Sequence, residues 1–315
     1  MPAKAGSHGP EEPPMPADPA GIEWLAPHEL PGCAAARDGR VVDVRPADAF
    51  ACGHVRGALS RPLDPAVIDA GPGAVDYALG VTVPSILLPA RHEPLVVIAG
   101  DRDTAGLVAG LLHARGRERT LACAIAADDA VPPTLREVGP RSGTLWSPPA
   151  FLARWAHLLP PPAHGPVLDL GCGSGRAAVW LARRGYRVTA VDHQEEALAL
   201  GRQLAGSAGV RVDWRRADLR EADALPAGPW SAALMFRYLE RPLVRALGRV
   251  LAPGATVMLR TFRHAPGYIG NPRPRHRLAR GEAAGLWPTA RVLVHEEGFD
   301  ADGKPAAGVV VRWTG

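Results

Sequence analysis

Residues 167–176, Val-Leu-Asp-Leu-Gly-Cys-Gly-Ser-Gly-Arg, constrain this chain more than any other segment. A short apolar run, a glycine-rich turn and the start of a helical pattern follow one another there. Such a unit suits a nucleotide, because the turn exposes backbone N–H groups and the helix N-terminus carries partial positive charge. The segment therefore predicts an α/β protein with a nucleotide-type cofactor at this turn.

The glycine spacing selects among nucleotides. A dinucleotide fingerprint needs a third glycine at the sixth position counted from Gly171, where this chain has Arg176. The glycines fall instead at Gly171, Gly173 and Gly175, and Asp169 stands just before them. A carboxylate there would repel a pyrophosphate and attract the ammonium of an amino-acid-like cofactor. The spacing thus argues against a nicotinamide- or flavin-dependent oxidoreductase.

The pattern resembles motif I of class I S-adenosylmethionine-dependent methyltransferases, and the resemblance continues downstream. Asp192 ends a predicted strand 21 residues after Gly171, a distance at which a carboxylate can accept both ribose hydroxyls. Asp218 stands where the family places an acid near the adenine amino group. The resemblance implies S-adenosylmethionine as cofactor, with Asp169 anchoring the methionine ammonium. It also implies that the three glycines let the backbone approach the cofactor.

The later apolar runs predict a Rossmann-like, doubly wound sheet that ends in an antiparallel strand pair. A turn signal at Asp302-Gly303 separates the two strands of that pair. Residues 252–254 resemble the family's L-x-P-G-G turn, with Ala255 in place of its second glycine. The predicted strands cover residues 167–170, 187–192, 209–214, 232–236, 255–259, 291–296 and 308–312.

Arg237 and Tyr238 are the candidates for contact with the methyl acceptor. They follow the fourth predicted strand, and loops beyond the carboxyl ends of strands line the ligand crevice in such sheets. The surrounding segments resemble a bacterial methyltransferase subgroup close to the tellurite-resistance type. In that comparison Arg260 replaces a glutamate and Ser231 replaces an acid. These changes alter the charge expected at the rim, so the resemblance does not specify the acceptor.

The expected chemistry is direct in-line methyl transfer, and the catalytic residue stays open. The protein mainly has to hold a nucleophile about 3 Å from the methyl carbon. An acid oxygen, a thiolate or a chalcogen anion needs no base, whereas Tyr238 could assist an amine or an alcohol. Cys172 is interpreted as a small turn residue, because no His or other base is visibly paired with it. No metal-ligand cluster is visible; His54, His276 and His295 lack suitably spaced partners.

The N-terminal half carries a second signature. Residues 41–45, Val-Val-Asp-Val-Arg, are followed by Phe50 and by Gly-His-Val-Arg-Gly-Ala at 53–58. This arrangement resembles the rhodanese, or sulfurtransferase, domain, and implies that Asp43 and Arg45 brace loops. The family's catalytic cysteine directly follows a buried strand, here 94–98.

That position holds Ala99 or Gly100, and the loop at 99–103 contains no sulfur. Without a thiolate there is no persulfide to carry. Cys52 and Cys123 are the only substitutes, and both are interpreted as small core residues. Residues 20–125 are therefore predicted to form a catalytically inactive rhodanese-like domain with a structural or docking role.

The remaining boundaries follow from composition. Residues 1–19 are predicted to be a disordered tail, 126–145 a linker, and 146–315 the methyltransferase domain. A helix is expected after Pro148, and two roles are open for Trp146 and Phe151 near its start. They either close the cofactor pocket or pack in an interdomain core.

Composition limits location and partners. No apolar run approaches 18 residues, no secretory signal is visible, and the four cysteines lack disulfide spacing, so a cytoplasmic protein is expected. The net charge is +4, and nearly all the positive charges belong to arginine. Arginine-rich tracts at 211–220 and 273–280 could steer an anionic substrate. Acids are scattered among them and no nucleic-acid module is present, so nucleic acid is not the expected partner. The oligomeric state is left open.

Together these features predict S-adenosylmethionine-dependent methyl transfer to a small molecule. Two alternatives remain: a regulatory or interaction protein that binds S-adenosylmethionine without turnover, and an RNA or protein methyltransferase. The lack of an N-P-P-Y-type tetrapeptide after the fourth strand argues weakly against a base-amine acceptor.

Overall fold

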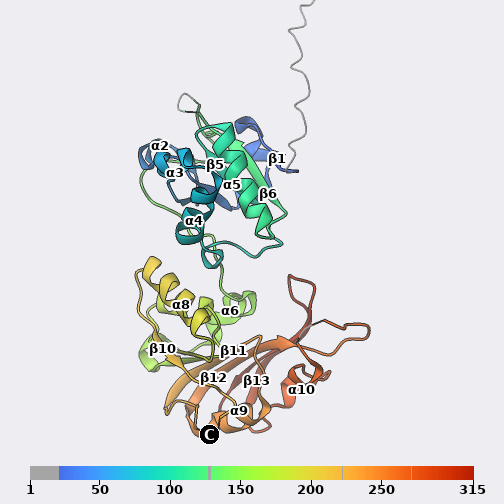
Figure 1. The fold of residues 1–315 in the computed structure, drawn as a ribbon. Coiled ribbons are helices and arrows are strands. Elements are labelled where there is room, and N and C mark those ends of the chain that lie inside the picture. The colour runs from blue at the N-terminus through green and yellow to red at the C-terminus, as the bar shows by residue number, and fades with distance from the viewer. Residues whose placement is uncertain (1–20, 127–128, 222, 271) are drawn as a thin grey trace, which may run out of the picture. The chain divides into compact units, whose positions relative to one another are not determined.

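The chain forms two compact units (Figure 1). The computed structural model describes residues 21–126, 129–221, 223–270 and 272–315. Unit 1 comprises Met1–Pro84 and Pro89–Leu145, and unit 2 comprises Ser85–Leu88 and Trp146–Gly315. The predicted tail at 1–19 lies outside the described residues.

Unit 1 is built on a five-stranded sheet in the order β1-β6-β5-β2-β4, and all its strand pairs are parallel. Every residue of β2 and β5 is buried, which is typical of a parallel sheet covered on both faces. The strands are β1 (Glu23–Trp24), β2 (Val41–Asp43), β4 (Leu59–Ser60), β5 (Leu95–Ala99) and β6 (Thr120–Ala124).

The helices of unit 1 are short except for α4 and α5. Helix α5 begins at Arg102 because the Asp101 carboxylate accepts a hydrogen bond from the Thr104 backbone N–H at 2.8 Å, a standard N-cap. Its residues Ala105, Val108 and Leu112 are buried at helical spacing. The helices are α1 (Ala34–Arg37), α2 (Ala47–Cys52), α3 (Pro65–Asp69), α4 (Pro72–Thr82) and α5 (Arg102–Ala114).

The segment expected to be a linker, residues 126–145, belongs to unit 1. Strand β7 (Arg136–Glu137) pairs antiparallel with β3 (His54–Val55). Val131 and Leu135 are buried in the same apolar cluster as Val55. The prolines and glycines of the segment predicted a linker, but the two apolar side chains between them anchor it to the unit.

Unit 2 is built on a seven-stranded sheet in the order β10-β9-β8-β11-β12-β14-β13. The five strands from β10 to β12 are parallel, and β14 pairs antiparallel with both β12 and β13. The chain leaves β8 toward β10 and then returns to β11 on the other side. This reversal places a ligand crevice at the carboxyl ends of β8 and β11.

The strands of unit 2 follow the predicted order, and the boundaries of β10 and β12 differ most from the prediction. The structure gives β8 (Val167–Leu170), β9 (Val188–Asp192), β10 (Asp213–Arg216), β11 (Trp230–Phe236), β12 (Leu251–Phe262), β13 (Arg291–Phe299) and β14 (Pro305–Arg312). The third strand was predicted at 209–214. It starts later because Gly209 and Val210 donate backbone hydrogen bonds that close the preceding helix. Strand β12 starts earlier, with a register jump between Leu251 and Thr256.

Alternate residues of the unit 2 strands face opposite helical layers. Leu168, Ala233 and Val257 pack with residues of α9 (Arg241–Ala246) and α10 (Glu282–Gly285). The neighbouring Val167, Ala232 and Met258 pack with residues of α6 (Ala150–Trp155) and α7 (Arg176–Ala182). Helix α8 (Glu195–Ser207) contacts α7, β9 and β10. Figure 1 shows α6 and α8 on one side of this sheet and α9 and α10 on the other.

No helix in the described parts of the chain has the length and apolar character needed to span a membrane.

Candidate functional site

A cavity of about 320 Å³ lies at the carboxyl ends of the unit 2 strands. Its lining comes from Gly171 after β8, from residues 192–194 at the end of β9, from residues 217–220 after β10, from Arg237 and Tyr238 after β11, and from His276. The structure therefore brings together five of the predicted site residues: Gly171, Asp192, Asp218, Arg237 and Tyr238.

Asp192 joins two elements at this cavity. One carboxylate oxygen accepts a hydrogen bond from the Gly173 backbone N–H at 2.8 Å, and the other accepts from the Gln194 N–H at 3.0 Å. The residue is 8% exposed. Oδ1 also lies 3.3 Å from His193 Nδ1. Oδ2 accepts only the Gly173 hydrogen bond among the described residues, so this oxygen can still accept from a ligand.

Asp169 lies beneath the glycine turn and is 2% exposed. The backbone N–H of Ala178 donates to it, while its Oδ2 has no hydrogen-bond partner among the described residues. Burial, and then the charge of Asp192, raise the pKa of Asp169 to about 7. Asp169 does not line the cavity itself. It supplies an unpaired buried acceptor, which costs about 1–3 kcal/mol unless a donor reaches it.

The three glycines of the turn have left-handed backbones, with φ of 67°, 52° and 67° for Gly171, Gly173 and Gly175. They differ in what surrounds them. A Cβ at Gly171 would overlap the Tyr238 side chain, and one at Gly175 would overlap the Trp214 ring. A Cβ at Gly173 would meet no atom within 4 Å. Of the three glycines expected to admit a cofactor, two are required by protein packing and only Gly173 faces open space.

Asp218 is held by Arg220, a residue that the sequence reasoning did not single out. The Arg220 guanidinium donates to both carboxylate oxygens, at 2.9 and 3.1 Å from Nε, and the Arg220 backbone N–H donates at 3.0 Å. These hydrogen bonds lower the pKa of Asp218 to about 2. The sequence feature that could have indicated this pair is the Asp-x-Arg spacing of Asp218 and Arg220, which also occurs at Asp43 and Arg45.

Tyr238 packs its ring over Gly171 and is half-buried. Burial, and then the charge of Glu240, raise the pKa of the phenol. The hydroxyl therefore keeps its proton near neutral pH, which makes Tyr238 a poor base.

Arg237 has φ of 58° and is the one non-glycine residue with positive φ in the described chain. Its backbone N–H donates to the Arg260 carbonyl at 2.8 Å, and its guanidinium pairs with Asp302. The guanidinium also lies 5.1 Å from the centre of the Phe262 ring. Such backbone strain often marks a functional site.

The two departures from the subgroup pattern occupy different places. Arg260 pairs with Asp300 at 2.7 Å and with Glu296 at 3.1 Å, so acids of β13 and the following turn compensate its charge. Ser231 lies at the amino end of β11, where its hydroxyl donates to the Pro166 carbonyl at 2.9 Å. Ser231 was expected at the rim, but the cavity lies at the opposite end of the strand.

The two aromatic residues proposed as pocket covers are buried. Phe151 is 4% exposed and Trp146 is 7% exposed, and neither lines the cavity. The Phe151 ring packs so closely on Gly308 of β14 that a Cβ there would lie 2.6 Å from it. Packing in the core is therefore the role that the structure supports for Phe151.

Cys172 is not activated. Burial, and then the charges of Asp169 and Asp192, raise the pKa of its thiol. Its Sγ lies 3.5 Å from the Gly173 carbonyl oxygen. Within the described ranges, no group of three or more His, Cys, Asp or Glu side chains is arranged to hold a metal ion.

In unit 1 the predicted Asp–Arg brace is present. Arg45 donates to both oxygens of the fully buried Asp43, at 3.0 and 3.2 Å from Nε, and its Nη2 donates to the Gly53 carbonyl at 2.9 Å. His54 stacks on Phe50 with ring centres 3.7 Å apart. These contacts join the end of β2 to the turn after α2.

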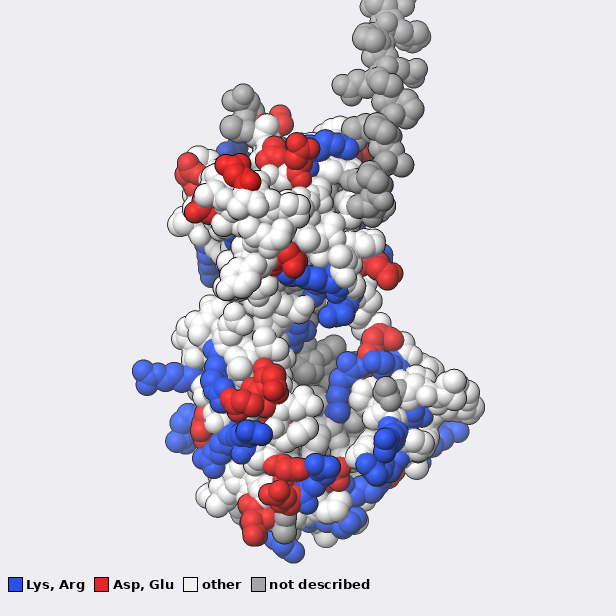
Figure 2. Space-filling view, in the orientation of Figure 1, with Lys and Arg blue, Asp and Glu red and all other residues white. Residues whose placement is uncertain are grey.

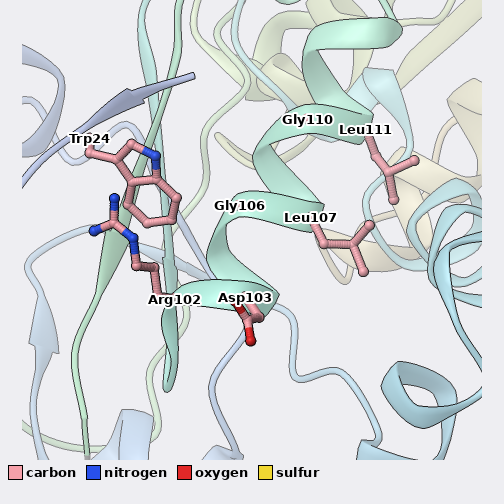
Figure 3. A pocket seen from close by; sticks show the side chains of 7 residues that line it. All are labelled: Trp24, Arg102, Asp103, Gly106, Leu107, Gly110 and Leu111. Atoms are coloured by element: carbon pink, nitrogen blue, oxygen red, sulfur yellow. The ribbon is translucent and has the colours of Figure 1, made fainter. Parts of the chain in front are cut away.

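A second hollow, of about 430 Å³, lies beside α5 in unit 1 (Figure 3). The Arg102 guanidinium lies 3.9 Å from the centre of the Trp24 ring at one side of it, and Leu107 and Leu111 line another part. None of its seven lining residues contains sulfur. Cys123 is buried, which raises the pKa of its thiol to about 12, and Cys52 is exposed at the end of α2.

Comparison with known proteins identifies part of unit 2. Residues 167–254 match the family model described as a methyltransferase domain. A ubiquinone biosynthesis O-methyltransferase from Xanthomonas axonopodis pv. citri is 34% identical over 110 residues, 33% of this chain and 46% of the relative. The same-named protein of Xanthomonas campestris pv. campestris is 32% identical over 105 residues, 32% of this chain and 44% of the relative. The chain thus spans less than half the length of these curated relatives.

Two solved structures are similar at lower identity. TehB from Haemophilus influenzae is 18% identical, with a TM-score of 0.45 over 52% of this chain and 61% of that protein. A methyltransferase from Methanosarcina mazei is 19% identical, with a TM-score of 0.42 over 50% of this chain and 96% of that protein. On the family match, unit 2 carries a methyltransferase domain over residues 167–254, which implies S-adenosylmethionine as its cofactor.

Proposed function

We propose that the chain transfers the methyl group of S-adenosylmethionine to a small-molecule acceptor in the unit 2 cavity. The observation that carries the proposal is the convergence of Asp169, Asp192 and Asp218. These acids come from the ends of β8 and β9 and the segment after β10, and they lie around one glycine turn.

The acids have separate proposed roles in holding the cofactor. The unpaired oxygen of Asp169 suits the methionine ammonium, because a buried carboxylate is stabilised by a cation that donates to it. Asp192 would accept from the ribose hydroxyls, and Asp218 would lie at the adenine. Gly173 leaves room for the cofactor to approach the backbone.

The acceptor would enter from the side of Arg237 and Tyr238. The cofactor supplies an already activated methyl group, so the protein has mainly to position a nucleophile on the axis of the breaking bond. The residues on this side include a fixed guanidinium and a neutral phenol. Both suit a polar group on a small-molecule acceptor. The relatives named for ubiquinone biosynthesis support an acceptor that is a small molecule. We further propose that the domain is similar to the tellurite-resistance subgroup.

Surface charge supports a small-molecule acceptor over nucleic acid. On the face drawn in Figure 2, acidic and basic side chains of unit 2 lie intermixed. Arg215 pairs with Asp213 and Arg220 with Asp218 within the arginine-rich tract at 211–220. A nucleic-acid surface instead requires a stripe of one sign.

For unit 1 we propose a rhodanese-like domain without sulfur transfer, over residues 20–125, in a structural or docking role. Support comes from the Asp43–Arg45–Gly53 brace and from the sulfur-free loop at 99–103. The methyltransferase domain is proposed to span 146–315. A cytoplasmic location is proposed because all four cysteines are free thiols in the structure.

Two measurements test the methyltransferase proposal. Calorimetry with S-adenosylhomocysteine should show binding at a ratio of one per chain, and no binding would refute the cofactor assignment. Incubation with isotope-labelled S-adenosylmethionine and a cell extract, followed by mass spectrometry, should then reveal a labelled small molecule. Binding without any labelled product would favour the regulatory alternative, and label in RNA or protein would favour the macromolecular one.

A further inference from the structure

We propose that His276 is the general base of the acceptor site, and that the acceptor is methylated on a hydroxyl oxygen. The inference rests on the proposed methyl transfer and adds the class of acceptor and the residue that takes its proton. It follows from the contacts of one imidazole that lines the cavity.

The imidazole lies between three polar groups. His276 ends the short 3-10 helix Pro274–His276 and lines the cavity together with Tyr238. Its Nδ1 is 3.4 Å from the Leu239 carbonyl oxygen and 3.5 Å from the Glu240 carboxylate. Its Nε2 accepts a hydrogen bond from Arg275 Nε at 2.9 Å.

These contacts determine which nitrogen carries the proton. Arginine can only donate, so Nε2 must be the acceptor nitrogen and the proton must be on Nδ1. The Nδ1–H then donates toward Leu239 and Glu240, both acceptors. The ring therefore presents a lone pair on Nε2, which among the described residues is occupied only by the exposed Arg275 side chain. A substrate hydroxyl can replace an exposed guanidinium at small cost.

The main chain around His276 is fixed by one side chain. Arg241 donates to the carbonyl of Arg275 at 2.7 Å and to that of Arg277 at 3.0 Å, the residues on either side of His276. Arg241 is itself held by Glu282 at 2.7 Å. A base must be held within hydrogen-bond reach of the proton that it takes, and this anchoring provides that constraint.

The other cavity-lining side chains are poorer bases. Tyr238 keeps its proton near neutral pH because its pKa is raised, and Asp218 has its pKa lowered by Arg220. The Asp192 oxygens accept from two backbone N–H groups. His193 lies 3.3 Å from Asp192 and so belongs to the proposed ribose end of the cavity. His276 is the imidazole on the side of Tyr238 and Glu240.

The proposed step balances without a further reactant. As the hydroxyl oxygen forms a bond to the methyl carbon, Nε2 of His276 takes the hydroxyl proton. The carbon–sulfur bond breaks and its electron pair stays on sulfur. The products are a methyl ether and S-adenosylhomocysteine. The imidazolium, stabilised by Glu240, returns its proton to water. A preformed anion would need no such base, so a working His276 indicates an acceptor that still carries its proton. A hydroxyl is proposed among such acceptors because the curated relatives are named O-methyltransferases.

The test compares His276→Asn with His295→Asn. His295 is a matched control because it lies 3.8 Å from Glu297 in a similar pair but does not line the cavity. Both variants should bind S-adenosylhomocysteine within about threefold of the unchanged chain. With labelled S-adenosylmethionine and cell extract, the unchanged chain and His295→Asn should give a product labelled at an O-methyl group. His276→Asn should form this product about 100- to 10,000-fold more slowly, the usual contribution of a general base.

A second readout does not depend on turnover. In nitrogen-15 spectra of the unchanged chain, the imidazole signal absent from His276→Asn should show the Nδ1–H tautomer. The proposal is overturned by the Nε2–H tautomer, by label on sulfur, nitrogen or carbon, or by full activity of His276→Asn. It is also overturned if S-adenosylhomocysteine binds but no labelled product forms. Failure of S-adenosylhomocysteine to bind refutes the proposed function instead.

Discussion

The carboxylate of Asp192 accepts a hydrogen bond from the backbone N–H of Gly173 at 2.8 Å. The acid at the end of β9 thereby holds the turn that follows β8. The same carboxylate lines the cavity and is the proposed partner of the ribose. Positioning of the turn and the proposed recognition of the cofactor therefore depend on one side chain.

Replacing Asp192 by alanine should remove both functions. Affinity for S-adenosylhomocysteine is expected to fall by about 1.5–3 kcal/mol, the scale of a lost charge-assisted hydrogen bond. Calorimetry measures this directly. Asp192→Asn is the control, because it keeps an oxygen that can accept from Gly173 but loses the charge. Its affinity for S-adenosylhomocysteine should lie between those of the unchanged chain and Asp192→Ala. Unchanged affinity in the alanine variant would show that the ribose is held elsewhere.

Replacing Asp169 by asparagine should change stability in a pH-dependent way. The folded-state pKa of about 7 lies above the unfolded value, so the folded chain holds an extra proton between about pH 4 and 7. The unchanged chain therefore loses stability as pH rises through that window, and asparagine does not. The stability of Asp169→Asn relative to the parent should rise by up to about 4 kcal/mol from pH 4 to pH 8.

Urea titrations at several pH values measure the free energy of unfolding of both chains. Calorimetry measures their affinity for S-adenosylhomocysteine. The same variant should bind S-adenosylhomocysteine more weakly, since it loses the charge proposed to hold the ammonium. A stability difference that is constant with pH would mean that Asp169 is ionised throughout.

Alanine at Gly171 and at Gly173 should separate packing from ligand access. Both positions have left-handed φ, which costs an alanine about 1–2 kcal/mol. Gly171→Ala also forces the Tyr238 side chain to move, so its unfolding free energy should fall further than that of Gly173→Ala. Gly173→Ala should instead show the larger loss of affinity for S-adenosylhomocysteine, although it loses less stability than Gly171→Ala. Equal losses in both assays would contradict the distinction between the two glycines.

The buried Asp43–Arg45 pair of unit 1 should contribute more to the free energy of unfolding than the exposed Asp38–Arg40 pair. Asp43→Ala leaves the buried Arg45 unpaired, and removing one partner of such a pair costs about 3–5 kcal/mol. Asp38→Ala removes a partner of Arg40 that is 55% exposed, and should cost less than about 1 kcal/mol. Thermal unfolding of the full chain compares the two variants. Similar losses of stability in both would show that the Asp43–Arg45 pair does not stabilise the fold.

Thiosulfate and cyanide should give no sulfur transfer with the purified chain. A thiol reagent at pH 8 should label exposed Cys52 and spare Cys123, whose pKa of about 12 keeps it protonated. Peptide mass spectrometry locates the label. Sulfur transfer that disappears in Cys52→Ala would overturn the inactive-domain proposal.

The sequence predicts the periodic parts of the fold well, for a physical reason. Strands such as β8 and β11 are continuous apolar runs, and their alternate residues supply both helical layers. The start of β10 was misplaced because Gly209 serves the helix before it, which the residue type alone does not reveal. The prolines of the segment at 126–145 predict a linker, and they obscure its two buried anchors, Val131 and Leu135.

The candidate site can be read from the sequence where its residues lie at short, fixed spacings. Asp169, Asp192 and Asp218 stand at fixed distances from the glycine turn. His276 was missed as a site residue because its partners Leu239 and Glu240 lie more than 30 residues away in the chain. Tertiary contacts of this kind leave no pattern in the sequence, and neither does the strained backbone of Arg237.

Trp214 shows what such packing implies for the evolution of the chain. Its ring fills the space that a Cβ would need at both Gly175 and Gly201. A larger residue at either position is therefore tolerated only after Trp214 has been replaced by a smaller side chain. Replacing Trp214 first, however, leaves a void beside the two glycines. The order in which these three positions can change is constrained, so this corner of the domain should show strong epistasis. It should resist single substitutions far more than coordinated ones.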